Sequence, residues 1–493
     1  MGLHHRRYGP WPAVCLLCVA FFVDVMGATS VFTAAPSLKR ALGLTPVGLQ
    51  WSITAATLPG GALLLVGGRL ADLLGRRRVF MIGVALLVIA SLICGLAPNP
   101  AVLIGGRVLQ GVAGALLIPA ALALVIGLFV DEAERNRALA AWSAIGGIGA
   151  TAGLVFGGLV TMGLGWQWVF LINVPVGLLM LSLSPLLLEE PLQPAASRKL
   201  DRTGIITFTG GLGLFIYGIS QVPDVGWASW RTLGCALAGL VLLVAFARIE
   251  GHTATPILPP WLLRSRSLLA GNATLFVAGI CVDGLLFTLT LYTQRIRGYS
   301  PLEFGGLTAV MTLCSTGAAA LAQRAVTRVG TSIVASVGVA LLTVTCALFA
   351  LATSLRTPLP LLLIGMVAFG LGMGCAFVAG SVASLQDVHD EDSGVAAAVQ
   401  NISFSTGTTA GVAVLSTIAT ATTAHLTSEG HADLADLTSG YRAAFIGGAV
   451  IAVLGLPATA GLRRRRPRLE ATTNRGGLGG PRPCTARRRR CSQ

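Results

Sequence analysis

Two long apolar segments are joined by the charged stretch Gly67-Gly68-Arg69-Leu70-Ala71-Asp72-Leu73-Leu74-Gly75-Arg76-Arg77-Arg78. The apolar run before it ends at Gly68, where the missing side chain would let a neighbouring helix approach closely. Asp72 is expected where one helix ends and the next begins, and Gly75 permits a turn between them. The triplet Arg76 to Arg78 is typical of a cytoplasmic loop, because such loops of membrane proteins carry an excess of basic residues.

The composition agrees with a membrane protein. The chain has 493 residues, is 54% hydrophobic and only 11% charged, and its mean hydropathy is +0.78. These values exclude an ordinary soluble globular protein. The formal net charge of +15 does not indicate a nucleic-acid partner, because eleven arginines and one acid follow Gly461. We expect this basic tail, residues 462–493, to be disordered and held near anionic lipid in the cytoplasm.

The first half of the chain contains six apolar stretches, each near the twenty residues that a helix needs to cross the hydrocarbon. We expect a retained first helix after a cytoplasmic segment 1–10, with no signal-peptide cleavage. The six predicted spans cover residues 11–35, 47–68, 79–97, 101–128, 138–161 and 167–188. Basic residues follow the second, fourth and sixth spans, which places the N-terminus and these loops in the cytoplasm.

The second half repeats this organisation after a charged linker, residues 189–202. Two spans, 203–222 and 231–249, are expected as an insertion, and a second linker covers 250–266. Six further spans are predicted at 267–292, 303–322, 331–353, 358–384, 393–420 and 441–461, which brings the total to fourteen. The chain is therefore expected to fold as two six-helix bundles, residues 11–188 and 267–461, with the inserted pair 203–249 between them and both termini cytoplasmic.

Three charged residues lie within predicted spans and away from their ends, where they are costly and therefore indicate function. Arg107 lies about six residues inside the fourth span, so its alternative is to reach the headgroups with its long side chain. Asp24 lies in the first span, and its alternative is hydration from the cytoplasmic end. Asp283 lies deep in the ninth span, where a carboxyl group could bind and release a proton; its alternative is a hydrogen bond to a neighbouring helix.

Several of these stretches resemble motifs of the major facilitator superfamily of transporters. The stretch from Gly68 to Arg78 resembles the family's loop between helices 2 and 3, which implies a conformational latch made by Gly68, Asp72, Gly75, Arg76, Arg77 and Arg78. The stretch Arg107-Val108-Leu109-Gln110-Gly111 resembles the fourth-helix motif, whose arginine lies within the membrane. Gln323 to Gly330 is a weak repeat of the first loop in the second half.

A glycine pattern in the fifth predicted span resembles the signature of exporters in this superfamily. Its members are Gly149, Gly153, Gly157 and Gly158. Small residues four apart form a flat stripe against which another helix packs and pivots. The family has a proline after the second glycine, and this chain has Leu154 there. This departure weakens the inference of export and leaves generic small-residue packing as the alternative.

Three further stretches resemble the fourteen-spanner drug:proton antiporter branch. They are Trp166 to Gly177, Gly298 to Leu302 with Gly305, and Gly394 to Ala398 with Gln400 and Asn401. The branch also carries an aspartate in the first helix, but that position is Gly27 here. Asp24 lies three residues earlier, about 4.5 Å along the helix axis and on nearly the same face. It is therefore a candidate to replace the missing carboxylate.

The resemblance implies a plasma-membrane protein that exports amphipathic organic compounds, such as drugs or antibiotics, in exchange for protons. The alanine- and arginine-rich composition and the short loops indicate a bacterial source. We expect a monomer that works without a metal or another cofactor, does not bind nucleic acid and is not an enzyme. Asp24, Arg107 and Asp283 are the candidate groups for proton coupling and substrate binding. The alternatives are a uniporter or importer of a metabolite, which Leu154 keeps open, and a scaffold or sensor that transports nothing. The sequence does not name the substrate.

Overall fold

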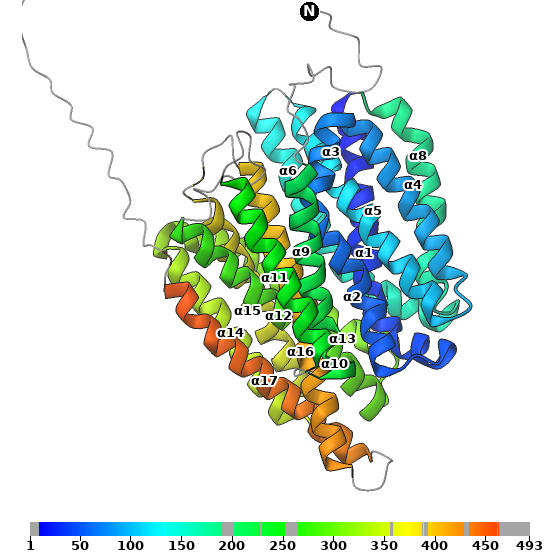
Figure 1. The fold of residues 1–493 in the computed structure, drawn as a ribbon, viewed down its shortest axis with the longest axis vertical. Helices are drawn as coiled ribbons and strands as arrows, with labels where there is room; N and C mark the ends of the chain where they lie inside the picture. The colour runs from blue at the N-terminus through cyan, green and yellow to red at the C-terminus, as the bar shows by residue number, and fades with distance from the viewer. Residues whose placement is uncertain are drawn as a thin grey trace, which may run out of the picture.

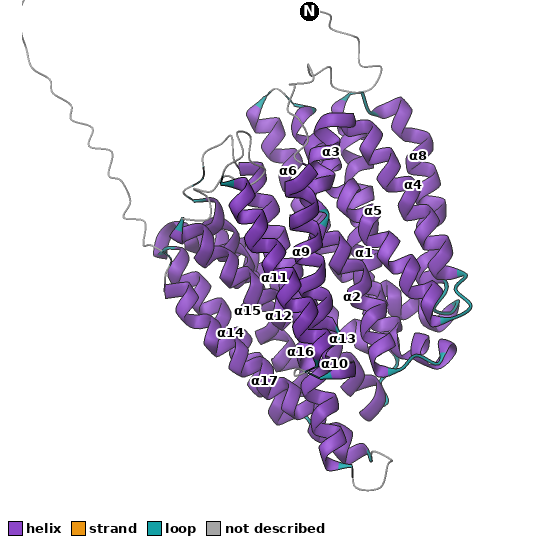
Figure 2. Ribbon diagram, in the orientation of Figure 1, coloured by secondary structure: helices purple, strands orange, loops and turns teal. Residues whose placement is uncertain are grey.

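The computed structural model describes residues 9–129, 131–189, 202–226, 229–251, 265–354, 358–386, 388, 393–427, 433–460 and 462. Apart from their ends, the expected cytoplasmic segment 1–10, both linkers and the basic tail lie outside these residues. The described residues are almost entirely helical and contain no strand (Figure 2). The predicted all-helical class is thereby confirmed.

The helices follow one another in three groups. The first is α1 (Pro10–Leu42), α2 (Pro46–Ala62), α3 (Leu64–Leu74), α4 (Arg76–Gly95), α5 (Pro100–Gly127), α6 (Glu132–Gly163), α7 (Trp168–Leu171) and α8 (Asn173–Leu187). The second is α9 (Arg202–Ser220), α10 (Val222–Val225) and α11 (Trp230–Glu250). The third is α12 (Arg266–Leu291) with a π-helical turn η2 (Tyr292–Ile296), α13 (Pro301–Val329), α14 (Thr331–Ala352), α15 (Leu359–Leu385), α16 (Ser393–Leu426) and α17 (Leu434–Ala460).

Each of the fourteen predicted spans coincides with a helix of the described chain. Twelve helices are long and apolar enough to cross a membrane. The second predicted span is a pair, α2 and α3, bent by 54°, and the seventh contains the shorter apolar helix Thr203–Ile219 within α9. The bend directly follows Pro59, Gly60 and Gly61, the residue types at which helices usually kink. A count of fourteen is therefore consistent with the structure.

Short polar or proline residues fix where several helices begin. The side chains of Thr45 and Asn99 accept hydrogen bonds from the backbone N–H groups at the starts of α2 and α5, and a proline follows each of them. Ser300 and Glu303 form a reciprocal capping box at the start of α13. These contacts satisfy N–H groups that a helix cannot bond internally. These caps fix the residue at which α2, α5 and α13 begin.

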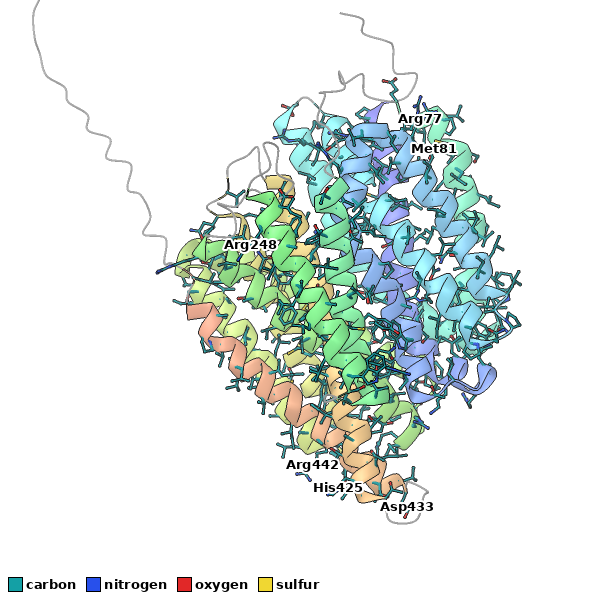
Figure 3. All side chains as sticks on the ribbon, viewed as in Figure 1. Arg77, Met81, Arg248, His425, Asp433 and Arg442 are labelled. Atoms are coloured by element: carbon teal, nitrogen blue, oxygen red, sulfur yellow. The ribbon has the colours of Figure 1, made fainter. Side chains whose placement is uncertain are left out.

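The molecule has two ends, which we name the Gly75 face and the Gly43 face after glycines of positive φ in the turns there. The chain enters α1 at the Gly75 face, the upper end in Figure 1, and leaves it at Gly43. Figure 3 shows Arg77 and Arg248 at the Gly75 face. It shows His425, Asp433 and Arg442 at the opposite end.

The first group meets the third mainly where α6 packs on α13 and where α2 packs on α16, and α1 also contacts α12 and α13. The inserted pair α9 and α11 packs on itself, and α9 also contacts α2 and α16. Figure 1 shows α9 and α11 in front of the junction between the two groups. Large apolar side chains such as Leu186 (70% exposed), Leu313 (70%) and Leu454 (73%) cover the outside. Exposed leucine in such numbers is expected where the neighbour is lipid.

Candidate functional site

The turn at Gly75 holds the ends of three helices together. Gly75 separates α3 from α4 at φ 102°, which favours glycine. Arg76 Nη2 lies 3.5 Å from Asp72 Oδ1, and Arg76 Nη1 donates to the carbonyl oxygen of Ala123 on α5 at 3.1 Å. Within the described chain, these partners all belong to the first half. Among the described residues, Arg76 therefore ties α3, α4 and α5 together and makes no hydrogen bond or ion pair to the second half.

The close helix approach before this turn is made by Gly67, whereas the sequence analysis assigned it to Gly68. A Cβ atom at Gly67 would collide with the backbone carbonyl of Ala115 on α5. At Gly68 the nearest atom would be Pro119 Cβ at 3.7 Å, an ordinary contact. Both glycines end the same apolar run, and only the rotation of the helix decides which of them faces α5.

Arg107 lies inside the first bundle. Its side chain is 2% exposed, and Nε donates to the carbonyl oxygen of Ser52 on α2 at 2.8 Å. Nη1 donates to Gln110 Oε1 at 2.7 Å, and the guanidinium lies 5.9 Å from the centre of the Phe170 ring. The alternative in which Arg107 extends to the headgroups is wrong, because the residue is buried and two of its N–H groups donate within the bundle. A buried charge is tolerated when it is bonded in this way.

Gln110 extends the polar network of Arg107 to two further helices. Its Nε2 donates to Ser91 Oγ on α4 at 3.1 Å, and the same oxygen accepts from Asn173 Nδ2 on α8 at 3.3 Å. Asn173 is 1% exposed, and its Oδ1 has no hydrogen-bond partner among the described residues. The sequence analysis quoted Gln110 and Asn173 within motifs but gave them no role. The spacing of Gln110, three residues after Arg107, was the available signal.

Asp24 lies half-buried at mid-length of α1. Its Oδ1 would be 2.9 Å from a Cβ atom at Gly114, so this glycine of α5 makes room for the carboxyl group. Asp24 also interacts electrostatically with Arg107. Gly27, the position that carries aspartate in the related branch, faces Asn173 of α8 instead, at 3.4 Å from its Nδ2. The two positions differ by about 60° around the helix and therefore face different neighbours.

Asp283 lies in the second half of the chain. It lies half-buried near the middle of α12, and its carboxyl group hydrogen-bonds with the side chain of Thr408 on α16. Gly279 and Gly284 on either side of it pack directly on the backbone of α16. The structure thus brings Asp24 and Arg107 together in one half and places Asp283 in the other.

The glycine stripe of α6 forms packing surfaces on two sides. Cβ atoms at Gly149, Gly153 and Gly157 would lie 3.2, 2.5 and 2.8 Å from backbone oxygens of α1. A Cβ atom at Gly158 would lie 2.6 Å from the carbonyl oxygen of Pro301, at the start of α13. Three of the predicted glycines therefore pack on α1 within the first half, and one packs on the second half.

The α2–α16 junction carries polar contacts between the halves. The Ser416 hydroxyl donates to Gln50 Oε1 at 2.8 Å, and the hydroxyls of Thr57 and Thr409 lie 2.9 Å apart. Gln294 on η2 donates to the carbonyl oxygen of Thr33 on α1 at 3.3 Å. These contacts lie between the Gly43 face and mid-depth. The sequence analysis did not predict these contacts, because serine and threonine also occur in membrane helices whose hydroxyls bond only within their own helix.

Comparison with known proteins places this arrangement in a family. The chain matches the model of the Major Facilitator Superfamily over residues 17–411 and 272–491. The puromycin resistance protein of Streptomyces alboniger is 37% identical over 443 residues, which are 87% of this chain and 85% of that protein. The lincomycin resistance protein of Streptomyces lincolnensis is 32% identical over 453 residues, 92% of each chain.

A solved structure shares the fold. A bacterial homologue of the human lysosomal transporter Spinster, in an inward-facing and unoccupied conformation, superposes with a TM-score of 0.65 at 16% identity, covering 94% of this chain and 98% of that chain. The fold is therefore that of a transporter with two helical bundles, as the order and packing of the helices indicate. The chain belongs to the Major Facilitator Superfamily.

Proposed function

We propose that this protein exports amphipathic organic compounds, antibiotics among them, from the cytoplasm in exchange for protons. Two relatives that span most of the chain are named for resistance to puromycin and to lincomycin. The proposed orientation puts the Gly75 face in the cytoplasm of a bacterial cell, because Arg76 to Arg78 lie on it. In this proposal the protein acts as a monomer in the plasma membrane and is neither an enzyme nor dependent on a metal or other cofactor.

The observation that carries the proposal is the placement of the two carboxyl groups. Asp24 and Asp283 lie near mid-depth, one in each half, and each is only half-buried. Asp283 has no ion-pair partner within the described part of the chain, and Asp24 has only an electrostatic interaction with Arg107, whose guanidinium is bonded to Ser52 and Gln110. A carboxylate without a counter-ion is costly away from water, so a change in water access between two conformations changes whether the group holds a proton. Alternating movement of the two halves supplies such a change.

The energy available from protons is adequate. Moving one elementary charge is worth about 2.3 kcal/mol per 100 mV of membrane potential. One proton per cycle could therefore sustain roughly a fiftyfold gradient of a neutral solute. The bound solute would lie between the halves near mid-depth, the usual place in transporters built from two repeats.

Efflux from cells that overproduce the protein tests this proposal. Puromycin, lincomycin and a broad compound panel are loaded, and their loss is followed with and without a protonophore. Export that the protonophore abolishes supports the proposal. Accumulation down a solute gradient without proton flux would instead support the uptake alternative, which α6 keeps open because Leu154 stands at the proline position of exporters. No movement of any compound across reconstituted membranes would favour a scaffold or sensor.

A further inference from the structure

A cavity of about 460 Å³ opens at the Gly43 face, and none of the motifs described above contributes to it. This volume lies within the roughly 300–1,000 Å³ of typical small-molecule sites. Its wall comes from α2, α12, η2, α16 and α17. Phe287, Leu291 and Leu437 give this wall an apolar character. The space is therefore suited to a ring system or a short hydrocarbon chain.

Among the polar groups around the cavity, the threonine hydroxyls donate to carbonyls of their own helices, whereas two other side chains can donate into the space. Arg295 of η2 and Tyr441 of α17 both line it, and their side chains are hydrogen-bonded to each other. Because the guanidinium has no acceptor, it donates to the Tyr441 oxygen and leaves the Tyr441 O–H available for a ligand. Lys39 of α1 lies close enough to Arg295 for their positive charges to interact. The lining includes no aspartate or glutamate, and Arg295 has no ion-pair partner among the described residues.

We propose that this cavity binds an amphipathic organic anion from the aqueous phase at the Gly43 face. The apolar part of the ligand lies against Phe287 and Leu291, and its carboxylate accepts hydrogen bonds from Arg295 and Tyr441. Arg295 follows Asp283 by twelve residues, which is roughly 18 Å along a helix. The site is therefore separate from the carboxyl groups to which the proton coupling is assigned. It goes beyond the proposed function, since binding here requires no transport.

Occupancy of this site has a consequence for the conformation. Val47 and Gln50 come from the first half, whereas the other lining residues come from the second half. Within the lining, the hydrogen bond from Ser416 of α16 to Gln50 of α2 joins the two halves. A movement that separates the halves at this face would divide the cavity. A bound anion therefore favours the conformation in which the two halves meet at the Gly43 face, because a ligand stabilises the state that it binds better.

Equilibrium binding to the full-length protein in lipid nanodiscs tests the inference. The probe is radiolabelled 2-naphthoate, and 2-naphthalenemethanol is the matched neutral compound with the same ring system. We expect the wild type to bind naphthoate more tightly than the alcohol. Arg295→Gln should weaken naphthoate binding by about tenfold, as expected for loss of a hydrogen bond between charged groups. Arg442→Gln, an exposed arginine on the same helix as Tyr441 but outside the lining, should leave the affinity unchanged.

A second variant protects the test against misfolding of the first. Thr420 lines the cavity, and within the described part of the chain its hydroxyl donates to carbonyls of its own helix. Thr420→Phe should therefore fill the space without removing a charge or a contact between helices, and it should abolish naphthoate binding. The inference is overturned if Arg295→Gln or Thr420→Phe binds naphthoate like the wild type. It is equally overturned if the neutral alcohol binds as tightly as naphthoate. No proton gradient is present, so the result is independent of whether the protein exports drugs.

Discussion

Alanine at Gly153 tests the packing of α6 on α1 with the smallest possible change. A Cβ atom there would collide with the hydroxyl of Thr29 and would lie 2.5 Å from the carbonyl oxygen of Met26, a backbone atom that cannot rotate away. An ordinary contact of this kind begins near 3.4 Å. The two helices must therefore separate locally by about 1 Å, and overpacking of this kind costs roughly 1–3 kcal/mol.

The matched control is the same substitution at Gly147, six residues earlier on α6. A Cβ atom there would lie 3.7 Å from its nearest neighbour, Thr316 Oγ1. Both variants gain the same helix propensity, so their difference isolates the close contact. Thermal unfolding of the purified full-length proteins should give Gly153→Ala a Tm lower than that of Gly147→Ala by roughly 2–6 °C. Equal unfolding temperatures would refute the packing described for the α6 glycine stripe.

Two other substitutions test the carboxyl site and the contact between the halves. Gly114→Ala should displace the Asp24 carboxyl group, which lies 2.9 Å from the added Cβ position, and should reduce proton-driven efflux at least tenfold. The control is Gly105→Ala on the same helix, where the added atom meets nothing within 4 Å, and its efflux should stay unchanged. Equal efflux by both variants would contradict the role of Asp24. In a double-mutant cycle of Thr57→Val and Thr409→Val, the unfolding free energies should show a coupling of about 0.5–1.5 kcal/mol, as for one hydrogen bond. Additive effects would mean that the 2.9 Å contact between the two hydroxyls contributes nothing to stability.

The spans could be predicted from hydropathy because lipid requires long uninterrupted apolar helices. The break between α2 and α3 was not predicted, although Pro59-Gly60-Gly61 precedes it, because proline and glycine are also common in unbroken spans. The first predicted span stopped at Ala35, whereas α1 continues to Leu42. The helix extends beyond the apolar run through Lys39 and Arg40, whose side chains can reach water.

The candidate site was predictable in its charges and not in its contacts. Arg107, Asp24 and Asp283 stood out because ionisable residues are rare inside spans. Their partners depend on which helices lie next to one another and on how each helix is rotated. Pairs such as Arg107 with the Ser52 carbonyl, 55 residues away, leave no pattern in a single sequence. The same limit explains why the close approach at Gly67 was assigned to its neighbour.

The most direct test of proton-coupled alternating access is transport by Asp283→Asn in liposomes of reconstituted protein. The compound is one that the efflux panel identifies, and two reactions are compared: movement driven by an imposed pH gradient, and exchange of labelled for unlabelled compound without a gradient. The account predicts that Asp283→Asn loses the driven movement and keeps the exchange, because the halves still alternate while the proton site is gone. Driven transport at the wild-type rate would contradict the account.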